Sequence, residues 1–372
     1  MFFILFFGII GFLHYVLLSH LGAAWPDFFW GFATILSALF VTPLLMGVSR
    51  KRQQHTLARL FALIGFTWLG GLFLWDCVLG VLALYNLLAP FIEVPPLSAP
   101  ATVWTSATIT LAGIAYGVIE ARAPRVKTVD LKLPKISGWA SPIRIVQLTD
   151  LHLGYVANAR RLSDLVIRVN ALKPDLIVST GDLFDSDFDR MTPLCRILAD
   201  LHAPLGKFAI SGNHEVYENL DQGLALTRQA GFRILRGESA RVRSGLTIVG
   251  VDDAEALKPG TSRGHEAGAL ATIHENDVRI LLKHRPTVLR ASLGKFDLQL
   301  SGHTHGGQIF PFSLLTRMVY RHGPGLNRLG ENAWLYLSRG TGTWGPQFRI
   351  FAPPEITLIT LSGASQTNPN KT

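Results

Sequence analysis

The sequence predicts N-terminal transmembrane α-helices followed by an α/β domain in which layered sheets are flanked by helices. Three observations support this prediction. The first 120 residues are almost free of charge, short β-branched runs alternate with helical stretches from about residue 140, and polar clusters follow five of those runs. We therefore expect a membrane domain over 1–120, a linker over 121–139, an α/β domain over 140–362 and a disordered tail over 363–372.

Composition separates the two parts of the chain. Of the 372 residues, 48% are hydrophobic, and the formal net charge is +9. Residues 1–120 hold four basic and four acidic side chains, so the whole net charge lies after residue 120. A basic surface suits anionic substrates or anionic lipids, or simply solubility. No nucleic-acid-binding motif is present. Cys77 and Cys195 lie one in each part and suggest no disulfide framework.

Four apolar stretches in the first part predict about four helices. They cover roughly 2–19, 28–48, 58–91 and 101–119, and a bilayer crossing needs about 20 residues. The third is overlong and contains Asp76, so we interpret it as one tilted helix, with a break near Asp76 as the alternative. An acid inside a membrane is a functional candidate, but capping or pairing near an interface is its more ordinary role.

Lys and Arg in the short loops predict the orientation. Basic residues follow the second stretch at 50–52 and the fourth at 122–127, whereas the loops at 20–27 and 92–100 contain no Lys or Arg. With four crossings, this pattern predicts a multi-pass protein of the inner (cell) membrane, with the N-terminus and the α/β domain in the cytoplasm. A third stretch that crossed twice would invert this orientation.

From about residue 140 predicted strands alternate with predicted helices. We expect helices at 160–172 and 192–202. Strands are expected at 143–149, 175–180, 207–211, 246–251, 278–282, 297–301, 334–338 and 356–361. The early alternation indicates βαβ units, and the strand-rich end indicates a second sheet.

Polar clusters follow five of these strands. In chain order they contain Asp150, His152, Asp182, Asn213, His214, His284, His303 and His305. Ligands of open α/β sheets bind at the carboxyl ends of strands, so we expect these side chains to meet. Carboxylate, imidazole and amide oxygen suit Mn, Fe or Zn. Two such ions about 3.5–4 Å apart need an anionic ligand between them, and Asp182 is placed at a strand end where it can bridge.

The order of these motifs resembles the calcineurin-like metallophosphoesterase superfamily. The resemblance covers roughly 140–362, and Gly-His-Thr-His-Gly-Gly-Gln together with Ser-Arg-Gly-Thr-Gly is similar to its transmembrane bacterial subgroup. In this sequence the motifs read Asp150-Leu-His152, Gly181-Asp182, Gly212-Asn213-His214, a lone His284, and Gly302-His303-Thr304-His305.

The resemblance implies a two-layer β-sandwich flanked by helices and a site for two divalent metal ions (Mn, Fe or Zn, with Mn favoured). It implies that one ion is bound by Asp150, His152 and His305, and the other by Asn213, His284 and His303. Asp182 would bridge them. His214 would stay off the metals, beside the substrate, as the catalytic residue.

The implied activity is hydrolysis of phosphodiester or pyrophosphate bonds through a metal-bridging hydroxide. The substrate would be a phosphorylated small molecule or a lipid-linked compound held among membrane lipids. A protein phosphatase, or a non-catalytic metal-stabilised sensor or scaffold, is the alternative. The glycines between 340 and 345 match a dinucleotide-binding pattern, but Pro346 and a strand-like segment follow instead of a helix, so we expect a tight loop beside the metal site there.

Overall fold

The structure is a computed structural model that describes residues 2–136, 139, 141–271, 273–274 and 276–363. The chain divides into two compact units. One contains the chain up to Ala123 together with Gln308–Phe312 and Trp344–Ala352, and we call it the helical unit. The rest of the chain forms the second unit, which we call the sheet unit.

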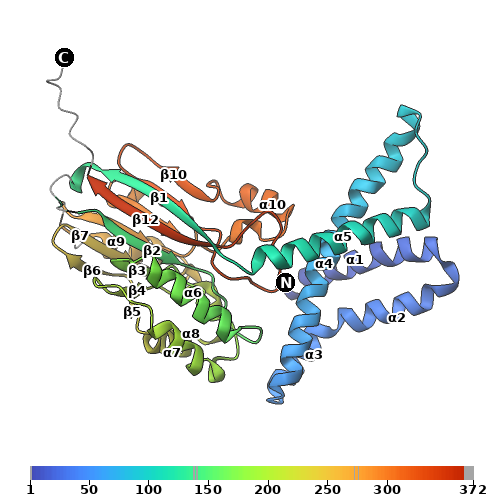
Figure 1. The fold of residues 1–372 in the computed structure, drawn as a ribbon, viewed down its shortest axis with the longest axis horizontal. Helices are drawn as coiled ribbons and strands as arrows, with labels where there is room; N and C mark the ends of the chain where they lie inside the picture. Colours follow the sequence, from blue (N-terminus) through green and yellow to red (C-terminus); the bar gives the residue numbers. More distant parts are fainter. Residues whose placement is uncertain (1, 137–138, 140, 272, 275, 364–372) are drawn as a thin grey trace. The chain divides into compact units, whose positions relative to one another are not determined.

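The helical unit is built from the predicted apolar stretches (Figure 1). Among its described residues, three helical segments are long and apolar enough to cross a membrane, and Gly8–Ala24 is a shorter apolar helix. The three segments are Pro26–Lys51, His55–Ile92 and Ala99–Ala121. The helices are α1 (Phe2–Ala24), α2 (Phe29–Phe40), α3 (Thr42–Lys51), α4 (His55–Leu88) and α5 (Ala99–Ala121). All four predicted stretches are therefore helical, and three have spanning length.

The third predicted stretch is one helix. α4 runs for 34 residues through Asp76, which confirms the single-helix interpretation over a break. The second stretch, in contrast, is divided at Val41 into α2 and α3. Pro43 has no N–H to donate to the Leu39 carbonyl four residues earlier. The Thr42 hydroxyl donates to that carbonyl instead, at 2.6 Å.

The described residues of the sheet unit form two six-stranded sheets. The first has the order β1 (Arg125–Leu133), β12 (Glu355–Gly363), β2 (Ile143–Leu148), β3 (Leu176–Ser179), β4 (Lys207–Ala209), β5 (Arg233–Ile234). The second has the order β10 (Gly325–Arg328), β11 (Trp334–Leu337), β9 (Leu298–Ser301), β8 (Val278–Leu282), β7 (Leu246–Gly250), β6 (Glu238–Arg243).

One hydrophobic core lies between the two sheets, because side chains such as Ile145 and Leu176 pack with Ile280 and Leu298. The outer face of the first sheet is covered by α6 (Ala159–Ala171), α7 (Thr192–Ala199) and α8 (Asn213–Gln229). The outer face of the second is covered by α9 (Ser262–Ala271). The predicted two-layer sandwich flanked by helices is confirmed.

The elements follow from local sequence. β2 is buried at every position except Arg144, as a central strand between two covered faces requires. In α6 the buried residues recur with helical spacing as Leu162, Leu165, Val166 and Val169. Asn158 begins that helix by accepting a hydrogen bond from the Arg161 N–H.

Three predicted boundaries need correction or fall outside the structure. The segment 121–139 is not a linker, because it contains β1, which pairs with β12 in parallel. In β1 only Val129, Leu131 and Leu133 are buried, and charged residues alternate with them. In the sequence, such a short alternation resembles a basic segment next to a membrane span. Gln308–Phe312 and Trp344–Ala352, assigned to the α/β domain, belong to the helical unit. Residues 364–372, in the predicted tail, lie outside the described residues.

Candidate metal centre

The predicted ligands lie at the carboxyl ends of neighbouring strands. β2, β3 and β4 are parallel neighbours in the first sheet, and β8 and β9 are parallel neighbours in the second. Each of these five strands leads directly into one polar cluster. Because parallel strands end at the same edge of a sheet, the five clusters meet as predicted.

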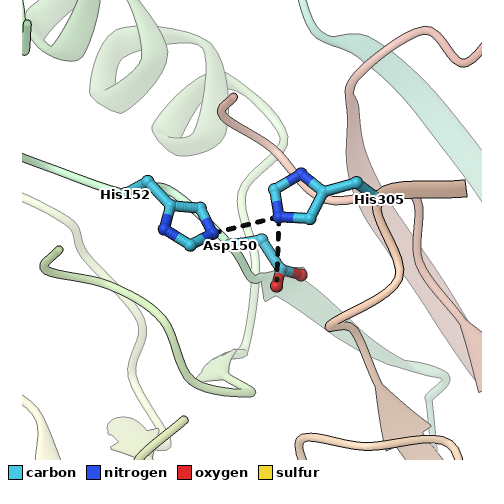
Figure 2. A group of neighbouring side chains, drawn as sticks. All are labelled: Asp150, His152 and His305. Atoms are coloured by element: carbon cyan, nitrogen blue, oxygen red, sulfur yellow. Dashed lines mark hydrogen bonds and ion pairs between the residues drawn. The ribbon is translucent and has the colours of Figure 1, made fainter. Parts of the chain in front are cut away.

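The first group of donors consists of Asp150, His152 and His305 (Figure 2). The Nε2 atoms of His152 and His305 lie 3.0 Å apart. The Nε2 atom of His305 also lies 3.7 Å from Oδ1 of Asp150. All three residues are buried, so their donor atoms are turned toward one another and away from bulk water.

The second group consists of Asp182, His284 and His303. Nε2 of His284 lies 3.1 Å from Nδ1 of His303 and 3.2 Å from Oδ2 of Asp182. The amide oxygen of Asn213 lies 3.0 Å from the same Nε2 atom. The lone His284 predicted from its strand end is thus at the centre of this group.

Asp182 faces both groups. Its Oδ2 atom is 3.2 Å from Nε2 of His284 and 3.7 Å from Nε2 of His152. Its Oδ1 atom accepts a hydrogen bond from the His214 N–H at 2.9 Å. Gly212 makes this position possible, because a Cβ atom there would collide with the Asp182 carboxylate. Asp182 therefore lies between the two groups.

The chemistry of the donors fits divalent cations. Nδ1 of His284 bonds the Thr180 carbonyl at 2.8 Å, which directs the Nε2 lone pair of the neutral ring toward the site. Burial lowers the pKa of His284, but the charges of Asp182 and Asp150 outweigh it and raise that pKa to about 10. Burial and the charges of His284 and Arg285 lower the pKa of His303 to about 3. The carboxylates therefore favour a positive charge at this site. The buried imidazoles, whose nitrogens face one another, offer ligands for a divalent cation.

His214 lies beside the donors and is held by a carboxylate that the sequence analysis missed. Its Nδ1 atom is 2.6 Å from Oδ1 of Asp185. Burial lowers the pKa of His214, but the hydrogen bond to Asp185 and the charges of Asp182 and Asp185 raise it to about 9. The protonated ring can donate from its other nitrogen. The signal for Asp185 was its position three residues after Asp182, in the same loop.

A second missed residue, Glu215, anchors the loop that carries Asp182. Its buried carboxylate accepts four backbone N–H groups. Oε1 accepts from Leu183 and Phe184 at 2.7 and 3.1 Å, and Oε2 accepts from Gly212 and Asp182 at 2.8 and 3.1 Å. Because Glu215 lies in the first turn of α8, it joins the Asn213 motif to the Asp182 motif.

Backbone conformation marks the same residues. Non-glycine residues rarely adopt positive φ, and those that do cluster at functional sites. Positive φ values between 49° and 73° occur at five of the predicted residues, namely Asp150, His152, Asp182, His303 and His305. The hydrogen bonds around the site hold these conformations, for example from the His303 N–H to both Asp150 oxygens at 2.9 and 3.1 Å.

The site is bordered by two further features. The Gly340–Gly345 loop begins against the metal motif, because the Thr341 and Gly342 N–H groups donate to the Thr149 and Asp150 carbonyls. Arg339, at the start of this loop, pairs with Glu355 at 3.1 Å. Two tyrosine rings also border the site. Tyr217 stands edge-on to His214, with the ring centroids 5.7 Å apart, and Tyr320 stands edge-on to His303, with the centroids 5.8 Å apart.

Comparison with known proteins identifies the family of this chain. The family model for calcineurin-like phosphoesterases matches residues 143–307. An uncharacterized metallophosphoesterase of Aquifex aeolicus (strain VF5) is 38% identical over 256 residues, which cover 67% of this chain and 96% of the relative. The chain belongs to the calcineurin-like metallophosphoesterases.

Other relatives of this metallophosphoesterase are longer than the matched region. An uncharacterized metallophosphoesterase of Campylobacter jejuni is 37% identical over 65% of this chain and 64% of its own length. A zebrafish (Danio rerio) protein named transmembrane protein with metallophosphoesterase domain is 32% identical over 69% of this chain and 62% of its own length. Membership identifies a metal-dependent phosphoesterase that acts on phosphate esters, and the apolar helices with the relatives' names indicate association with a membrane.

Proposed function

We propose that this protein is a membrane-anchored phosphohydrolase with two metal ions that cleaves phosphodiester or pyrophosphate bonds. The observation that carries the proposal is the meeting of two donor groups at one carboxylate, Asp182. In this proposal Asp150, His152 and His305 hold one ion. Asn213, His284 and His303 hold the other.

The ions would activate a water nucleophile and neutralise the phosphoryl oxygens. The protein's own residues do the rest. His214 is charged near neutral pH because its pKa is about 9, so it can hydrogen-bond a phosphoryl oxygen or give a proton to the leaving oxygen. Asp185 fixes the orientation of the ring through Nδ1. The presence of this pair beside a full donor set argues against a purely structural metal site.

Hydrolysis of bis(p-nitrophenyl) phosphate by detergent-purified protein tests the activity. We expect turnover that depends on Mn²⁺, is abolished by a chelator and returns when Mn²⁺ is restored, with Fe²⁺ and Zn²⁺ as comparisons. His214→Ala is the control, since it removes the proton donor and leaves the metal donors. Equal rates with and without metal, or in the variant and the wild type, would contradict the proposal.

We propose further that the apolar helices anchor the protein in the inner (cell) membrane with the sheet unit in the cytoplasm, where lipid-linked phosphate substrates are within reach. The support is the basic segment at 50–52 and the absence of Lys and Arg at 20–27 and 92–100. Protease added to sealed inverted vesicles should digest the sheet unit. Protection of that unit until detergent is added would place it on the opposite side.

A further inference from the structure

α10 (Phe312–Val319) has its apolar face turned to solvent. None of its residues is buried. Leu314 and Leu315 are about half exposed, and Met318 and Val319 are 82% and 74% exposed. Residues four apart lie on the same face of a helix, so these four side chains form one apolar surface. Such a surface on a soluble domain marks an interaction site.

The opposite face of α10 is polar and faces the protein. Ser313, Thr316 and Tyr320 are less exposed than the apolar residues, and Tyr320 stands against His303 of the metal centre, with the ring centroids 5.8 Å apart. An amphipathic helix on a globular domain normally buries its apolar face and exposes its polar one. In α10 this arrangement is reversed, so its outer partner must itself be apolar.

The segment just before α10 indicates that this partner is lipid. Phe312, the first residue of the helix, belongs to the helical unit, where its ring packs edge-on against Phe73 of α4 at 6.0 Å. In the same unit the Arg349 N–H donates to the carbonyl of Gly117 at 3.0 Å. Gly117 is one turn before the end of α5, and basic residues begin at Arg122. Ile309, three residues before α10, packs in one cluster with Val118 of α5, so the segment that leads into α10 lies near the basic end of that candidate membrane span.

The charges beside the apolar face fit the same partner. Arg317 and Arg321 are exposed, and they flank the segment Met318–Tyr320 in the sequence. Basic side chains that border an apolar helix face bind the anionic headgroups of a bilayer while the apolar residues enter the acyl boundary. A second protein would not need this combination of basic border and interfacial attachment.

We propose that α10 is an interfacial helix whose apolar face, formed by Leu314, Leu315, Met318 and Val319, lies in the headgroup–acyl boundary of the bilayer and delivers amphiphilic phosphoesters to the metal centre. The delivery step rests on the proposed phosphohydrolase function. Tyr320 follows the helix directly and contacts His303, so a lipid with its chains along α10 has its phosphate close to the donors.

Depth-dependent quenching tests the position of α10 without any need for activity. Met318→Cys is labelled with the fluorophore NBD in the full chain carrying Cys77→Ala, and the protein is reconstituted in phosphatidylcholine–phosphatidylglycerol vesicles. Cys195 can stay, because its side chain is buried and burial raises the pKa of its thiol to about 11, which keeps it unreactive. The matched control is Ile167→Cys on α6, an exposed apolar position at 66%.

Lipids carrying a doxyl quencher near the headgroup should reduce emission from position 318 at least about twofold and leave position 167 unchanged, because only an interfacial helix reaches that depth. Equal emission at the two positions would overturn the proposal. So would a disulfide-linked dimer of the Met318→Cys protein that shows no quenching, since that result would assign the face to a second copy of the chain.

A kinetic comparison tests the delivery of substrate. The double variant Leu315→Ser/Met318→Ser should hydrolyse vesicle-borne diacylglycerol pyrophosphate about tenfold more slowly, because removing two apolar anchors costs about 1.4 kcal/mol or more of lipid contact. Its hydrolysis of water-soluble bis(p-nitrophenyl) phosphate should not change, and Ile167→Ser should behave as wild type. A variant equal to wild type on both substrates, or impaired equally on both, would contradict delivery. A wild-type protein inactive on every phosphoester would instead refute the phosphohydrolase proposal, while the quenching result still decides the position of α10.

Discussion

Replacement of Glu215 by alanine tests whether one buried carboxylate holds the metal centre together. Its two oxygens accept four backbone N–H groups at 2.7–3.1 Å. A buried donor left without a partner costs about 1–3 kcal/mol, so the loss is at least about 4 kcal/mol. At roughly 2–4 °C per kcal/mol for a domain of this size, the Tm should fall by about 10 °C. Glu215→Gln should lose about half as much, since its amide oxygen keeps two donors and its NH₂ group opposes the others.

The assay for Glu215 is thermal unfolding of detergent-purified protein with a chelator present, so that metal binding does not contribute to stability. Metal content is then measured by mass spectrometry after reloading with Mn²⁺. We expect Glu215→Ala to bind less metal, because Asp182 and Asn213 lose their common anchor. Glu238→Ala, at an exposed position, is the control and should change stability by less than about 0.5 kcal/mol. A Glu215→Ala protein with the wild-type Tm and full metal content would refute this reasoning.

Three further substitutions separate metal binding from proton transfer. His214→Ala should retain both metal ions and lose about 10²–10⁴-fold in kcat, measured with a diester substrate; a kcat within about twofold of the wild type would remove its catalytic role. Asp185→Asn should reduce kcat by about tenfold with metal content unchanged, because it removes the charge that favours the protonated ring; a loss of metal instead would make Asp185 a ligand. Asp182→Ala should lose metal, measured directly as ions per protein, and wild-type occupancy would exclude bridging.

The composition and the order of motifs predicted much of this protein. The first 120 residues, which carry few charges and no net charge, contain helices of membrane-spanning length. The alternation of strands from Ile143 onward predicted β2, β3, β8 and β9 within a residue or two. The five clusters at strand ends were predicted to meet because parallel strands end at one edge. The structure brings all of their residues together.

Other features could not be predicted because they depend on partners distant in the chain. The sequence of β1 predicts a linker, because its short alternation forms a strand only by pairing with β12, more than 200 residues later. In the sequence Glu215 has no feature that separates it from other helix residues. Its role depends on the N–H groups of Leu183 and Phe184, about 30 residues earlier, which donate to its carboxylate in the folded chain. Short elements such as β5 and β10 carry too few residues for a periodic pattern.

Composition and local periodicity were enough to predict which part of the chain is apolar, which strands form and which side chains can bind metal. Three features appear only in the folded chain: Asp185 supports His214, Gln308–Phe312 and Trp344–Ala352 pack with the helices, and α10 turns its apolar face outward. These features depend on which surfaces meet when the chain folds. The four-residue spacing of Leu314 and Met318 fits a helix that buries its apolar face in the protein equally well as one that turns it outward. Only the exposure of the two side chains in the folded protein distinguishes these cases.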